Sequence, residues 1–157
     1  MGKSTAQNKG LEVNMEKQRF GDFRDLEVWQ KCRQIRKAIW NLCRKLPEEE
    51  KYRLKDQMIR ASRSATACIA EGYGRFHFKE SIQFCRHARG SLYELIDHIL
   101  VAAECDYISA DVEENLISEI KTAIRLLNGY IKYLKSRTNK PSSAPQSTNR
   151  PITHLTI

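Results

Sequence analysis

The sequence lacks any apolar run close to the roughly 20 residues that a helix needs to cross a lipid bilayer. Residues 1–21 are polar and mixed in charge, so they lack the apolar core of a secretory signal peptide. We therefore expect a cytoplasmic protein that does not enter a membrane. A length of 157 residues, with 41% hydrophobic and 29% charged residues, is typical of one soluble domain that buries its own core.

Patterns that hold metals or cofactors are also lacking. The five cysteines form no Cys-x-x-Cys pair and mostly fall at apolar positions, which is typical of small reduced core residues. They are Cys32, Cys43, Cys68, Cys85 and Cys105. His87 and His98 share a helical face but would lie about 16 Å apart along it, too far to bind one metal. With His77 and Cys85 they are the only gathered candidates for ligands or nucleophiles, so we expect no metal, no cofactor and no enzymatic activity.

Strand signals are nearly absent, and no phosphate-binding loop follows a predicted strand. Gly72 and Gly74 form a lone Gly-x-Gly without the other residues of a nucleotide-binding fingerprint. The favoured interpretation is that residues 61–70 form a helix rich in small residues, and that the two glycines end it with a positive φ available. A phosphate cradle is the less favoured alternative.

Four apolar stripes are present, each with the alternating steps of three and four that indicate a helix. Pro47 ends the first helix, the acids at 48–50 suit the start of the second, and Ser109 can cap the fourth after a turn at 106–109. Each helix should contain about 20 to 27 residues, or roughly 30 to 40 Å. In chain order the stripes are Trp29, Cys32, Ile35, Ile39, Leu42 and Leu46; Leu54, Met58, Ala61, Ala65 and Cys68; Ile82, Cys85, Leu92, Ile96, Ile99 and Ala103; and Leu116, Ile120, Ala123, Leu127, Ile131 and Leu134.

Because the connections are short, consecutive helices must run antiparallel. We predict an all-α protein, an up-down-up-down antiparallel four-helix bundle over residues 23–136. Residues 1–22 are predicted to be a flexible extension, and residues 137–157, rich in Pro, Ser and Thr, a disordered tail. Ile152, Leu155 and Ile157 leave open the alternative that the tail contains a docking peptide.

Three segments carry a family resemblance. They are Phe23-Arg24-Asp25-Leu26-Glu27-Val28-Trp29-Gln30-Lys31; Gln57-Met58-Ile59-Arg60-Ala61 with Ser64 and Ile69-Ala70-Glu71-Gly72-Tyr73-Gly74-Arg75; and Lys79-Glu80-Ser81-Ile82-Gln83-Phe84 with Gly90-Ser91-Leu92-Tyr93-Glu94-Leu95. Together they resemble the bacterial four-helix-bundle family encoded by intervening sequences in 23S ribosomal RNA genes. The resemblance extends from residue 23 to about 136. Thr66 and Cys68 stand where the family often has Pro and Asn.

The resemblance implies a small non-enzymatic bundle that assembles as a ring-like homo-oligomer, commonly a pentamer. A related branch is similar to the accessory variability protein of diversity-generating retroelements, a basic barrel that binds nucleic acid and its reverse transcriptase. The partners that the resemblance implies are therefore other copies of the chain, RNA or DNA and, for the retroelement branch, a reverse transcriptase.

A formal net charge of +8 makes an acidic partner plausible. In the predicted bundle, the starts of helices one and three and the ends of helices two and four share one end, which collects bases, whereas the other end collects acids. The candidate nucleic-acid-binding residues are Lys31, Arg33, Arg36, Arg60, Arg63, Arg75, Lys79, Arg86, Arg89 and Lys132, with Lys135 and Arg137 beside them. The acids at the opposite end are Glu48, Glu49, Glu50, Glu104, Asp106, Asp111, Glu113 and Glu114.

Helix dipoles explain many of these charges, because acids favour helix N-termini and bases favour C-termini. They do not explain the six bases between residues 31 and 45, which face only Glu27. We therefore favour a basic surface that binds nucleic acid, with Tyr73 and Phe76 as candidates for base stacking. Two alternatives stay open: these aromatics seal the bundle end, and the basic face binds an acidic protein partner as an interaction scaffold.

Overall fold

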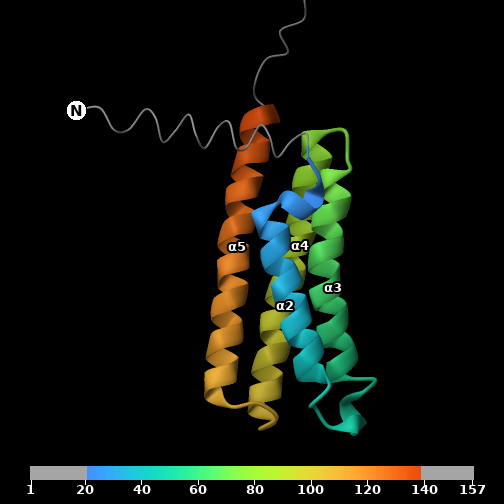
Figure 1. The fold of residues 1–157 in the computed structure, drawn as a ribbon, viewed down its shortest axis with the longest axis vertical. Coiled ribbons are helices and arrows are strands. Elements are labelled where there is room, and N and C mark those ends of the chain that lie inside the picture. Colours follow the sequence, from blue (N-terminus) through green and yellow to red (C-terminus); the bar gives the residue numbers. More distant parts are fainter. Residues whose placement is uncertain (1–20, 139–157) are drawn as a thin grey trace, which may run out of the picture.

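Four long helices stand side by side in the computed structural model, which describes residues 21–138 (Figure 1). They are α2 (Glu27–Cys43), α3 (Leu54–Tyr73), α4 (Phe78–Glu104) and α5 (Ala110–Thr138), accompanied by two short 3-10 helices, η1 (Phe23–Asp25) and η2 (Glu48–Glu50). No strand occurs among residues 21–138. The predicted all-α bundle is confirmed. The predictions for residues 1–20 and 139–157, including a docking role for Ile152, Leu155 and Ile157, lie outside the described residues.

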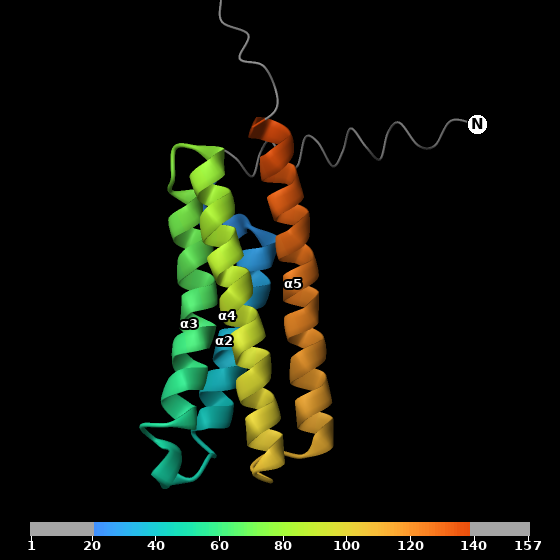
Figure 2. The same ribbon diagram turned by 180° about the vertical axis from the view of Figure 1, so that it is seen from behind.

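The helices occupy the corners of a square. Figures 1 and 2 show α2 on one face and α4 on the opposite face, with α3 and α5 on either side. Each helix contacts the two beside it, and α3 and α4 make the most extensive contact. In the orientation of Figure 1, the upper end holds the α3–α4 connection and the last turns of α5. The lower end holds η2 and the α4–α5 connection.

The core runs the length of the bundle, and Ile39, Met58, Leu95 and Leu127 are fully buried in it, one from each helix. Most of the predicted stripe residues are buried. In α2 the inward face is the predicted one, and the structure differs from the prediction only at the edges of the stripe. The buried residues of α2 are Val28, Cys32, Ile35, Ile39 and Cys43. Trp29 and Leu42 lie at the edge of the core and are half-buried. The Trp29 side chain is therefore partly exposed.

The connection at the end of α2 differs from the prediction. The helix ends at Cys43, four residues before Pro47, although Leu46 is still buried. The acids at 48–50 form η2 and precede α3 rather than occupying its first turn. Glu50 nevertheless serves the start of α3, since its Oε2 accepts a hydrogen bond from the Leu54 backbone N–H at 3.1 Å.

The predicted turn after α4 is confirmed. Asp106 has a φ of 58°, the backbone N–H of Asp106 donates to Ala103, and that of Tyr107 donates to Ala102. This pairing is the Schellman motif, with aspartate in place of the usual glycine. Ser109 then caps α5, its Oγ accepting from the Val112 backbone N–H at 3.4 Å. The helix reversal at the lower end is therefore encoded locally.

Gly72 has a different role from the one predicted. It lies inside α3 and is buried, and no glycine among the described residues has a positive φ. A Cβ atom added at Gly72 would lie 2.9 Å from the Cβ of Phe84 and 3.2 Å from the carbonyl oxygen of Ser81. The absent side chain thus lets the first turns of α4 approach α3. The expectation of a positive φ was wrong, because the chain leaves α3 at Gly74 with a φ of −74°.

The cysteines follow the expected pattern with one exception. All five are free; Cys32, Cys43 and Cys85 are buried, and Cys105 is exposed at the lower end. Burial raises the pKa of the Cys32 and Cys85 thiols to about 12. These two residues are therefore inert thiols that pack as small apolar side chains.

Two alanine substitutions separate close packing from helix propensity. Gly72→Ala should lower the free energy of unfolding by about 1–3 kcal/mol, because the new methyl group meets Phe84 and Ser81. Gly129→Ala, in the middle of α5 with nothing within 4 Å of the new Cβ, should raise it by about 0.5–1 kcal/mol. Urea unfolding followed by circular dichroism measures both. Equal stabilisation by the two variants would contradict the close approach at Gly72.

Candidate nucleic-acid interface

Two adjoining hollows lie along the outer side of α2. The first, between α2 and α3, has a volume of about 330 Å³ and is lined by Arg36, Lys37, Trp40, Asn41, Ile59, Ser62 and Arg63. The second extends toward η1, has a volume of about 450 Å³ and is lined by Arg24, Trp29, Gln30, Arg33, Gln34 and Lys37. Lys37 lines both, so we treat them as one surface, the α2 groove. Among the described residues, no carboxylate lines either hollow.

The helical period explains why these side chains meet. Trp29, Arg33, Lys37 and Trp40 follow one another at steps of four, four and three, which places them on one face of α2. The buried positions, centred on Ile35, occupy another face and hold the helix in this rotation. α3 closes one side of the groove with Ile59, Ser62 and Arg63. The groove is therefore a surface strip of two aromatic rings separated by two cations.

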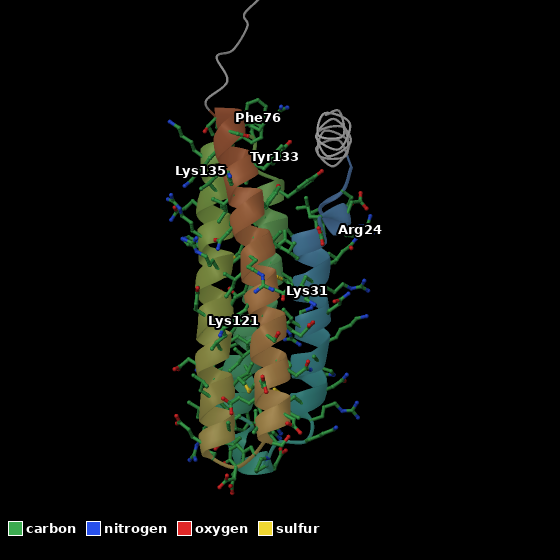
Figure 3. All side chains as sticks on the ribbon, turned by 90° about the vertical axis from the view of Figure 1, so that its left-hand side faces the viewer. Arg24, Lys31, Phe76, Lys121, Tyr133 and Lys135 are labelled. Carbon is green, nitrogen blue, oxygen red and sulfur yellow. The ribbon has the colours of Figure 1, made fainter. Side chains whose placement is uncertain are left out.

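The cations of the groove are held to different degrees. Arg36 is half-buried, and its Nη1 donates a hydrogen bond to Thr66 Oγ1 at 2.8 Å. The guanidinium of Arg33 lies 5.9 Å from the Trp29 ring centroid, and that of Arg63 lies 5.8 Å from the Trp40 centroid. Arg24, shown beside η1 in Figure 3, pairs with Asp22 at 2.9 Å.

Among the cations that line the groove, Lys37 is the most available to a ligand. It is exposed, and within residues 21–138 it has no hydrogen bond, ion pair or ring contact. It also lies where the two hollows meet. An anion bound at this point would have the ammonium group of Lys37 together with the neighbouring guanidinium groups of Arg33 and Arg36.

The distribution of charged residues differs between the helices as well as between the two ends of the bundle. α4 has no Lys or Arg after Arg89, and α5 has no acid after Glu119, so both helices change from acidic at the lower end to basic at the upper end. α2 has no such gradient, because Glu27 is its only acid. The lower end, expected to be acidic, also holds bases: Arg44, Lys45, Lys51, Arg53 and Lys55. α2 therefore combines four bases with a single acid at its first residue.

Three of the ten basic residues predicted from the sequence lie together in the groove: Arg33, Arg36 and Arg63. The other seven lie outside the groove, and five of them come from the predicted upper end: Arg75, Lys79, Arg86, Arg89 and Lys132. Lys31 turns toward α5 and pairs with Glu119, as Figure 3 shows between the two helices. Four of the remaining six contact a neighbouring side chain. Arg60 lies 3.7 Å from Asp56, Arg75 pairs with Glu71, and the Nη1 atoms of Arg89 and Arg86 donate to Asn128 at 2.9 Å and to Gln83 at 3.4 Å. The other two, Lys79 and Lys132, are exposed.

The two aromatics predicted to stack on bases differ in exposure. The Tyr73 hydroxyl donates to the Gly21 carbonyl at 2.7 Å, and the half-buried ring packs against the core. Burial, followed by the charges of Asp22 and Asp25, raises the pKa of Tyr73. Phe76, by contrast, is 91% exposed at the upper end (Figure 3). Of the two residues, only Phe76 presents an open ring to a ligand.

Sequence reasoning missed Trp29, Lys37 and Trp40 as site residues. Trp29 was assigned to the core because it continues the three-and-four spacing of the first apolar stripe, and Trp40 was assigned to no stripe. The signal that could have identified them is the helical spacing of Trp29, Arg33, Lys37 and Trp40, which places these four residues on a face of α2 other than the buried one. Arg24 was likewise missed, because η1 orients it toward the groove.

Within residues 21–138, no group of three or more His, Cys, Asp and Glu residues is arranged to hold a metal ion. A pair of possible ligands does occur in α4, where His98 Nε2 lies 3.5 Å from Glu94 Oε1, one turn away. No helix in the same range is long and apolar enough to cross a membrane.

The fold and the groove define a basic four-helix bundle with an aromatic-lined surface. The sequence model of the 23S rRNA-intervening sequence protein family matches residues 24–129, and the chain belongs to this family. The resemblance noted in the sequence is thereby confirmed at the level of the family. The connection to the retroelement branch stays a prediction.

A solved structure with the same fold is that of a protein of unknown function from the S23 ribosomal protein family of Bacteroides thetaiotaomicron. It is 23% identical to this chain with a TM-score of 0.63, and the match covers 67% of this chain and 95% of that one. At this identity the similarity concerns the fold alone. No curated protein matches the chain significantly.

The groove cations should separate into structural and available groups. Arg36→Gln should lower the free energy of unfolding by about 1–2 kcal/mol, because Thr66 loses a charged hydrogen-bond donor in a half-buried site. Arg33→Gln, an exposed residue with a ring contact only, should change it by less than about 0.5 kcal/mol. Thermal and urea unfolding of the two variants provide the comparison. A larger loss for Arg33→Gln would show that the structural cation has been misassigned.

Proposed function

We propose that the chain is a non-enzymatic adaptor that binds nucleic acid through the α2 groove. The observation that carries the proposal is the row formed by Arg33, Arg36, Lys37 and Arg63, with no carboxylate lining the same surface. Clustered cations of this kind attract a phosphate backbone and release its counterions on binding. The net charge of +8 adds long-range attraction for a polyanion.

Helix dipoles do not account for this row. Stabilising cations are expected in the last turn of a helix, and the last turn of α2 contains no base. Arg33, Arg36 and Lys37 lie in the middle of α2, and Arg63 lies in the middle of α3. Ion pairing does not account for them either, since no acid reaches them among the described residues. A row of this kind matches a ligand with repeated negative charges.

Neutralising two exposed groove cations tests the proposal. The double variant Arg33→Gln with Lys37→Gln should bind a stem-loop RNA or a matched DNA duplex about tenfold more weakly near 100 mM salt. The slope of log affinity against log salt should fall by about 1.4 to 1.8, because two phosphate contacts are lost. Fluorescence anisotropy across about 50 to 300 mM salt measures both quantities.

The matched control changes two cations on α5, Lys121→Gln with Arg125→Gln. Both are exposed, and Figure 3 shows Lys121 on the surface of α5, away from the groove. This control should leave the affinity within about twofold. A loss confined to the control would move the interface to α4 and α5. Failure of the unmodified protein to bind either probe at low salt would reject the proposal and favour an acidic protein as the partner of the basic face.

Assembly into a homo-oligomer is part of the same proposal. The outer side of α4 exposes Tyr93 by 58% and Leu100 by 39%. Gly90, one turn before Tyr93, leaves open space where a side chain would stand. These features support a second copy packing against α4. Each added copy would repeat the α2 groove, and simultaneous contacts along one strand would increase the overall affinity.

The mass of the protein in solution tests whether it assembles into an oligomer. A pentamer, the number implied by the family resemblance, should elute with five times the 18.2 kDa of one chain in light-scattering chromatography. Tyr93→Glu with Leu100→Glu should shift the mass toward that of a single chain, because two buried charges would oppose packing. Tyr52→Glu, at a residue 83% exposed in the connection before α3, is the matched control and should leave the mass unchanged. A monomeric unmodified protein would contradict this part of the proposal.

A further inference from the structure

Both tryptophans of the chain lie on the α2 groove. Trp29 and Trp40 are eleven residues apart, a separation that returns to the same face of a helix after three turns. They stand about 16 Å apart along the helix axis. One tryptophan borders each hollow, and Lys37 lies between them. The groove thus has an aromatic ring toward each end and cations in the middle.

The two rings are only partly covered. Trp40 is 48% exposed, and the guanidinium of Arg63 lies over its ring. Trp29 is half-buried and meets Phe23 edge-on, with ring centroids 5.1 Å apart and an interplanar angle of 77°. The guanidinium of Arg33 lies near its ring. Large aromatic rings left open beside cations are a feature of surfaces that bind unpaired bases.

Taking the proposed nucleic-acid binding as the basis, we infer that the α2 groove holds a single strand rather than a duplex. Unpaired bases stack on Trp40 and Trp29, and the phosphates between them contact Arg33, Lys37 and Arg63. In a duplex the base faces are covered by neighbouring pairs and cannot reach an indole ring without unpairing. A duplex would therefore use the cations and leave both tryptophans without a partner.

The remaining lining residues are consistent with a single strand. Gln30, Gln34 and Asn41 carry side-chain amides, each of which has donors and an acceptor for base edges. Such edges are accessible only when the bases are unpaired. Arg33 and Arg63 lie near the rings through weak contacts at almost 6 Å, so a stacking base can displace them. The released guanidinium groups are planar donors that suit phosphate oxygens.

Intrinsic fluorescence reports this binding directly, because the chain contains only these two tryptophans. The full-length protein is titrated with an unlabelled, non-self-complementary oligonucleotide of roughly 16 nucleotides, a length within the site sizes of single-strand binders. The arms are the RNA strand, the DNA strand of the same sequence, and the DNA duplex. Either single strand should quench the tryptophan emission, and the relative affinities of the two identify which strand the groove prefers. The duplex should bind more weakly and leave the emission unchanged.

A pair of variants tests whether stacking contributes to affinity. Trp40→Leu keeps an apolar side chain of reduced size and should weaken single-strand binding about tenfold, the effect of losing one stacked base, without changing duplex binding. Tyr52→Leu is the matched control. Tyr52 is 83% exposed and has the Lys51 ammonium 5.5 Å from its ring centroid, but it lies outside the groove. This variant should bind as the unmodified protein does.

The outcomes distinguish this inference from the function on which it rests. Duplex binding at least as tight as single-strand binding, with no change in tryptophan emission, would overturn the single-strand inference and leave nucleic-acid binding intact. Equal losses in Trp40→Leu and Tyr52→Leu would also overturn it. No binding of any of the three probes at low salt would reject the proposed function itself. Because Trp40 is almost half exposed, its replacement should preserve the fold, and the quenching measurement requires no variant.

Discussion

The rotation of α2 about its own axis is the constraint on which the candidate site depends. Ile35 and Ile39 must face the core, since they are almost completely buried between the other helices. At 3.6 residues per turn, that requirement leaves Arg33, Lys37 and Trp40 facing outward. The groove is therefore a direct consequence of core packing. A change that rotated α2 about its own axis by one residue would bury cations and, at the same time, expose aliphatic side chains.

The packing of the bundle explains why hollows lie along α2. Small residues in α3, above all Gly72, draw α4 close, so that α3 and α4 pack along most of their length. α2 is the shortest of the four helices, with 17 residues, and it makes less contact with α3 than α4 does. Hollows lie along both seams of α2. The one with α3 is bounded by the long side chains of Arg36, Trp40 and Arg63, and the one with α5, where the contact is smaller still, is lined by residues that include Leu42 and Asp111.

The sequence was sufficient to predict the elements of the bundle but not its groove. Apolar periodicity identified four helices, and local chemistry at Ser109 and Asp106 identified the turn at the lower end, because these signals act over a few residues. The stripe predicted for α2 identified the inward face correctly at Cys32, Ile35 and Ile39, but at its edge Val28 rather than Trp29 is the buried residue. Periodicity identifies the inward face but not the outward side chains that line a groove with a neighbouring helix. The ten bases were grouped from the antiparallel order of the helices, which assigns residues to one end of the bundle but not to one face of it.

The distribution of charge also sets the direction in which a bound strand would run. A ligand held at the upper end would contact the α3–α4 connection, the start of α4 and the last turns of α5, where Arg75 and Arg89 are engaged with Glu71 and Asn128 and Lys79 and Lys132 are exposed. A strand along α2 would instead meet cations at successive turns, with Lys37 unengaged at their centre. Since phosphates repeat along a strand, a row parallel to the helix axis matches them better than a cluster at one end. The bundle axis and the strand would then be roughly parallel.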